Sequence, residues 1–79
     1  MRIFLGKTGI IKKGSLHVNK SNVDVANWRV KVFKDRDYLI LLEKPKNQDF
    51  EYWYDFMVES EDLILKFFEE TDWEIEWKD

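Results

Sequence analysis

Apolar and polar residues alternate along three stretches of this chain, and this alternation constrains the fold more than any other feature. The stretches cover residues 28–34, 50–58 and 72–78. Side chains two residues apart share one face of a β-strand, so each stretch predicts a strand with one apolar face. A continuous apolar run at 38–42 predicts a further strand, apolar on both faces. The chain is therefore expected to form mostly β-sheet.

A single helix is expected between the last two alternating stretches. Apolar residues recur there at the spacing of one helical face, namely Leu63, Ile64, Phe67 and Phe68. Ser60 precedes them and is the expected N-cap. We expect the helix over about 60–70 and a last strand over about 72–78.

Together these elements predict an α+β fold made by a single domain, residues 1–79. We expect one small sheet of five to six short, mostly antiparallel strands, with the helix packed on one face. A chain of 79 residues buries only a small core, and we expect the six Phe, three Tyr and four Trp to supply much of it. A small barrel with an appended helix is the alternative. The strand order and the face that the helix covers stay open.

Turns are expected where glycine, proline or polar residues interrupt these patterns. Residues 35–37 predict a tight turn between the two strands of a hairpin. Residues 43–49 contain the only proline and no aliphatic or aromatic residue, so they predict the clearest loop in the chain. The glycines at positions 6, 9 and 14 predict breaks between short strands.

Side chains that carry enzyme chemistry are scarce. The sequence has no cysteine and one histidine, His17, so neither a disulfide framework nor a zinc quartet is available. Gly6-Lys7-Thr8 is similar to the end of a phosphate-binding loop, but Met1 stands where that loop needs its first glycine. A domain of this size has little room for a cleft between paired carboxylates. We expect no enzyme activity, no metal site and no cofactor.

The net charge of −3 conceals two halves of opposite sign. Residues 1–46 contain eleven Lys or Arg and four Asp or Glu, whereas residues 47–79 contain two and twelve. The two halves either neutralise each other across a sheet or form a bipolar surface that steers a charged partner. Basic residues interleaved with aromatic ones over 29–38 would suit nucleic acid, but the overall acidity disfavours it.

The acidic half is the expected binding surface. We expect Trp53 to anchor a basic protein and nearby carboxylates to attract it. The expected electrostatic contacts are Asp55, Glu69, Glu70, Asp72, Glu74 and Glu76. The expected function is that of a small, non-enzymatic protein-binding domain. A stoichiometric inhibitor or an immunity-type protein that binds a nuclease or another nucleic-acid-binding protein fits this description.

Self-assembly is the alternative function. The basic half of one chain would dock on the acidic half of another and give a homodimer or a structural subunit. No apolar run approaches the length of a membrane span or a signal peptide, and a chain without cysteine is compatible with a reducing cytoplasm. We expect a cytoplasmic protein with no membrane partner.

Overall fold

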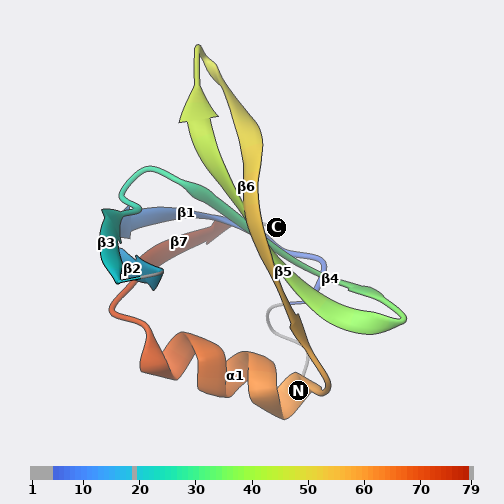
Figure 1. Ribbon diagram of the computed structural model, residues 1–79. Helices are drawn as coiled ribbons and strands as arrows, with labels where there is room; N and C mark the ends of the chain where they lie inside the picture. The colour runs from blue at the N-terminus through green and yellow to red at the C-terminus, as the bar shows by residue number, and fades with distance from the viewer. Residues whose placement is uncertain (1–4, 19, 79) are drawn as a thin grey trace.

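The computed structural model describes residues 5–18 and 20–78 (Figure 1). The strands are β1 (Thr8–Lys13), β2 (Ser15–Val18), β3 (Ser21–Asp24), β4 (Arg29–Asp35), β5 (Asp37–Lys46), β6 (Asp49–Val58) and β7 (Glu74–Lys78), and the helix is α1 (Glu61–Glu70). The structure confirms the predicted α+β class, with a single helix among the described residues and a strand after it.

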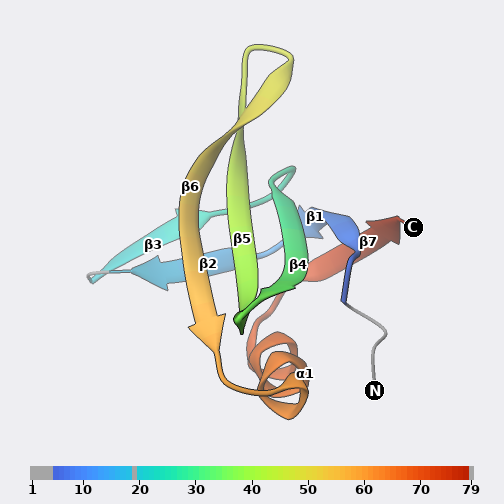
Figure 2. The same cartoon turned by 90° about the vertical axis from the view of Figure 1, so that its right-hand side faces the viewer.

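Five of the strands form an antiparallel sheet in the order β6-β5-β4-β1-β7. β6 and β7 are the two edges and run in the same direction, because four antiparallel pairings separate them. α1 connects them and lies along one face of the sheet (Figures 1 and 2). β2 and β3 form a separate two-stranded hairpin. The sheet that the sequence predicts is therefore accompanied by an additional hairpin.

The core lies between the sheet, α1 and the β2–β3 hairpin. The pairing of β4 with β5 places Val30 opposite Leu42 and Val32 opposite Ile40, so these four side chains share one face. The buried residues are Ile11, Val25, Trp28, Val30, Val32, Ile40, Leu42, Ile64 and Trp73. The predicted common face of residues 28, 30 and 32 is confirmed, since all three are buried.

A chain of aromatic rings links both edge strands to the helix. Consecutive ring centroids lie 4.9 to 5.9 Å apart, in the edge-on or tilted arrangements that aromatic pairs prefer. The chain runs through Trp28, Trp53, Tyr54, Phe56, Phe67, Phe68 and Trp77. Phe67 therefore packs α1 against β6, and the neighbouring Phe68 packs it against β7.

α1 begins as its sequence predicts. Ser60 is the N-cap, because its Oγ accepts a hydrogen bond from the backbone N–H of Leu63 at 3.4 Å. Ile64 is buried, and the hydroxyl of Thr71 donates to the carbonyl of Phe68 where the helix ends. Among the described residues, no helix is long and apolar enough to cross a membrane.

The predicted loop over 43–49 is wrong. β5 continues to Lys46 and β6 begins at Asp49, which leaves a two-residue turn. Pro45 is tolerated because β4 pairs with β5 only as far as Glu43, and beyond that point β5 has a free edge where a residue without an N–H costs no ladder hydrogen bond. The β5–β6 hairpin projects beyond the rest of the sheet (Figures 1 and 2).

The predicted break at Gly9 is also wrong, because β1 runs through it, whereas Gly14 does separate β1 from β2. Gly14 has a φ of +152°, and a Cβ at this position would lie 2.5 Å from Cδ1 of Trp73. Close packing of Trp73 against the backbone therefore requires glycine at this turn.

Candidate protein-binding surface

Five of the predicted contact residues lie on one continuous segment, from the last turn of α1 into β7. We call this segment the acidic strip, and its exposed carboxylates belong to Glu69, Glu70, Asp72, Glu74 and Glu76. Ile75 and Trp77 pack against the core, so the alternation of β7 turns Glu74 and Glu76 to the face opposite α1. The strip therefore wraps around the β7 edge of the sheet.

The acidic strip begins at the negative end of the helix dipole. Glu69 and Glu70 occupy the last turn of α1, which contains no basic residue. Within the described part of the chain, neither residue forms an ion pair, and nor does Glu74. An acidic side chain at a helix C-terminus costs about 0.3–1 kcal/mol. Glu69 and Glu70 therefore lie at the helix end at some cost in stability.

Asp72 is held in the fold. Its carboxylate accepts hydrogen bonds from the backbone N–H of Ser15 at 3.0 Å and from the Ser15 hydroxyl at 3.2 Å. The bond from the backbone N–H is the main reason that the pKa of Asp72 is lowered. The indole N–H of Trp73 donates to the carbonyl of Ser15 at 2.8 Å. Asp72 therefore fastens the strip to the start of β2 while its side chain stays exposed.

Other charges of the two halves are neutralised across the sheet. Nζ of Lys12 lies 3.9 Å from Glu76, across the β1–β7 pair. Nζ of Lys46 and Nζ of Lys44 lie 3.2 and 3.4 Å from Glu51, across the β5–β6 hairpin. The hydrogen bond from Lys46 is the main reason that the pKa of Glu51 is lowered. Cross-strand neutralisation thus reaches Glu76 of the acidic strip, whereas Glu69, Glu70 and Glu74 have no ion pair among the described residues.

The basic and aromatic residues of β4 are not a free cationic platform. Nε of Arg29 lies 2.6 Å from Glu43, and Nζ of Lys31 lies 3.6 Å from the same carboxylate. The Arg29 guanidinium also lies over the ring of Phe50, 4.3 Å from its centroid. Glu43 therefore cancels part of the positive potential that phosphate binding needs.

Trp53 and Asp55 lie on β6, at the edge opposite the acidic strip. Neighbouring strands are about 4.8 Å apart, which separates the two edges by roughly 19 Å measured across the sheet. Asp55 accepts a hydrogen bond from the hydroxyl of Tyr52 at 2.9 Å, and this bond raises the pKa of Tyr52. The structure does not bring these two predicted residues together with the other five.

A β-bulge reverses the direction of Trp53 from the one that alternation predicts. The pairing of β5 with β6 shifts register between Leu42 and Glu43, and Trp53 is the extra residue on β6. Trp53 is half-buried and lies edge-on against Trp28, with ring centroids 5.0 Å apart. Much of the surface of the Trp53 side chain is therefore in contact with the rest of the protein.

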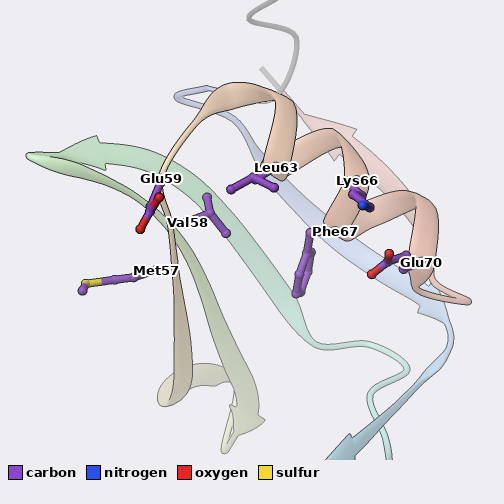
Figure 3. A pocket seen from close by; sticks show the side chains of 7 residues that line it. All are labelled: Met57, Val58, Glu59, Leu63, Lys66, Phe67 and Glu70. Carbon is purple, nitrogen blue, oxygen red and sulfur yellow. The ribbon is translucent and has the colours of Figure 1, made fainter.

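A groove that the sequence did not predict lies between the end of β6 and α1, with a volume of about 520 Å³ (Figure 3). It is lined by Met57, Val58, Glu59, Leu63, Lys66, Phe67 and Glu70. The helical residues recur at spacings of three and four, so they form one side of α1. Leu63 is 41% exposed and Met57 is 69% exposed. The sequence predicted Leu63 and Phe67 on the apolar face of the helix, but it did not predict that β6 lies across the groove from them.

Comparison of the chain with protein-family models, curated proteins and solved structures finds no match. The surface is therefore interpreted from its own chemistry. Among the described residues, no three His, Cys, Asp or Glu side chains are grouped as metal ligands would be. The described surface offers a partner exposed carboxylates at both edges of the sheet and a groove with apolar and charged lining residues.

Proposed function

We propose that the protein is a non-enzymatic binding domain whose acidic strip binds a basic surface of another protein. The position of Glu69 and Glu70 carries this proposal, because they lie at the negative end of α1 without a basic neighbour in the last turn. A basic residue at either position would stabilise the helix. Charges that cost stability are common where function requires them.

The strip would act mainly on the rate of association. Like charges gathered on one side of a small protein create a potential that steers an oppositely charged partner. Affinity must come from apolar contacts close to the strip, since exposed charge pairs contribute little. Glu70 belongs both to the strip and to the rim of the groove, where Leu63 is exposed. The two features are therefore continuous.

A stoichiometric inhibitor or immunity-type protein is the function that this arrangement favours. The nucleic-acid site of a nuclease is basic because it must hold phosphates. Carboxylates spaced along residues 69–76 would occupy such a site and exclude the nucleic acid. A domain of this type needs no catalytic group of its own.

Affinity capture from cells of the source organism tests the proposal. Three forms are used: the wild type, Glu74→Lys, and Asp37→Lys as the matched control. Glu74 and Asp37 are both exposed strand residues, and both substitutions change the charge equally. We expect one basic protein to be retained at low salt by the wild type and the control, released at high salt, and lost with Glu74→Lys. Equal retention by all three forms would contradict the site.

Sedimentation at low and high salt separates this function from self-assembly. A bipolar self-assembling chain forms a dimer or larger species at low salt, where attraction between opposite charges is strongest. A binding domain for another protein sediments as one chain under both conditions, and we expect that result. A low-salt dimer that dissociates in salt would support self-assembly instead.

A further inference from the structure

β6 has a free outer edge. It pairs only with β5, and within residues 5–18 and 20–78 no backbone–backbone hydrogen bond joins it to another element. The bulge at Trp53 divides the strand into two regularly paired parts, and residues 54–58 form the part nearer to α1. A free strand edge offers unpaired N–H and C=O groups to an extended segment of another chain.

The groove lies directly beside this regular segment (Figure 3). Val58 lines the groove and packs against the core on the side of α1, whereas Asp55 alternates to the opposite face. A strand added to β6 would therefore place every second side chain over the groove, near Leu63, and the intervening ones beside Asp55. The surface therefore fits a segment in which side chains that suit the groove alternate with side chains that suit the surroundings of Asp55.

Charge determines which segment fits. The charged side chains beside residues 54–58 are mostly acidic: Asp55 on β6 and Glu59 and Glu70 at the groove, against Lys66. β7, the opposite edge of the five-stranded sheet, carries Glu74 and Glu76 against one Lys78. Like charges directly opposite each other destabilise strand pairing, so either edge of a second copy is a poor occupant of β6. A basic segment has the complementary charge.

We infer that β6 binds an extended basic segment of the partner by strand addition, with apolar side chains over the groove and basic side chains beside Asp55. This inference rests on the proposed function, because it gives the mode in which the basic partner is held. It assigns the apolar anchoring contact to Leu63 and Val58. The expected partner segment alternates apolar and basic residues over about five positions, the length of β6 after its bulge.

A peptide titration tests strand addition directly. The probe is Lys-Val-Lys-Val-Lys-Val, added to isotope-labelled protein while amide hydrogen exchange is followed. We expect slower exchange of amides in residues 54–58, and roughly tenfold weaker binding after Leu63→Gln. Asp55→Lys should weaken binding through the other face of the strand, so the test does not depend on one variant. The same peptide with alternate backbone N-methylation keeps its charge and side chains, and it should not bind.

The possible failures are distinguishable. Absence of binding at millimolar peptide, or binding without slower exchange in β6, overturns strand addition, while capture of a basic partner through the acidic strip would still support the proposed function. Slower exchange in β6 that grows with protein concentration in the absence of peptide identifies a second copy as the occupant and also overturns it. Loss of salt-dependent capture by the wild type would instead reject the proposed function.

Discussion

Trp53 lies edge-on against Trp28, with ring centroids 5.0 Å apart and planes inclined at 71°. This contact makes Trp53 part of the core edge, so we expect Trp53→Ala to lower the free energy of unfolding by about 2 kcal/mol, below the 3–5 kcal/mol typical of a fully buried Trp. Urea unfolding measures the change. Tyr52→Ala is the control, because Tyr52 is 60% exposed and its loss should change stability little. Unchanged stability in Trp53→Ala would show that the ring is free to anchor a partner.

Gly14 provides a second test of the packing around α1 and β7. A Cβ at Gly14 would lie 2.5 Å from Cδ1 and 3.0 Å from Cα of Trp73. We expect Gly14→Ala to cost about 2–4 kcal/mol, from steric overlap and from its positive φ. Gly6 also has a positive φ, but no atom lies within 4 Å of its added Cβ, so Gly6→Ala should cost about 1 kcal/mol. Equal thermal shifts in the two variants would show that Trp73 moves away freely.

Acidification should weaken the attachment of the strip to β2. Hydrogen bonds from Ser15 lower the folded-state pKa of Asp72 below its ordinary value of 3.8. Asp72 therefore contributes stability at pH values above 3.8, and this contribution is lost as the pH falls through the lower folded-state pKa. Urea unfolding of the wild type and Asp72→Asn over this range measures it. We expect the stability advantage of the wild type to be constant above about pH 5 and to shrink in acid. A difference that is independent of pH would contradict this role.

Reversal of charge at the end of α1 should stabilise the fold. Glu69 lies in the last turn of α1, which has no basic residue, so we expect Glu69→Lys to raise the free energy of unfolding by about 0.3–1 kcal/mol. Asp62 lies in the first turn, where the helix dipole favours an acidic group. Asp62→Lys should therefore lower stability by a similar amount. Chemical denaturation at low ionic strength compares the two, and a destabilising Glu69→Lys would mean that Glu69 has a stabilising contact within the fold.

The central strands and the helix could be predicted because the spacing of apolar residues within one element shows which of its faces is buried. Trp28, Val30 and Val32 alternate in the sequence and are all buried. Ser60 precedes a helical stripe and caps it. Both patterns depend on local geometry alone, which explains why the sequence was sufficient.

The features that the sequence did not predict depend on how separate elements pack against one another. The bulge at Trp53 arises from the register of β6 with β5, and strict alternation along β6 contains no sign of it. From the sequence alone, Pro45 predicts a loop. It is acceptable in β5 because the pairing of β4 with β5 stops at Glu43, before the proline. The groove joins β6 to α1, two elements whose apposition follows from the whole topology.

The association rate of the captured partner, measured as a function of salt, tests the acidic strip most directly. We expect Glu74→Lys to slow association at low salt by roughly tenfold, and the difference from the wild type to disappear at high salt, because screening removes steering. Asp37→Lys should associate like the wild type. Equal low-salt association rates for the wild type and Glu74→Lys would contradict the proposal that the strip recognises the partner.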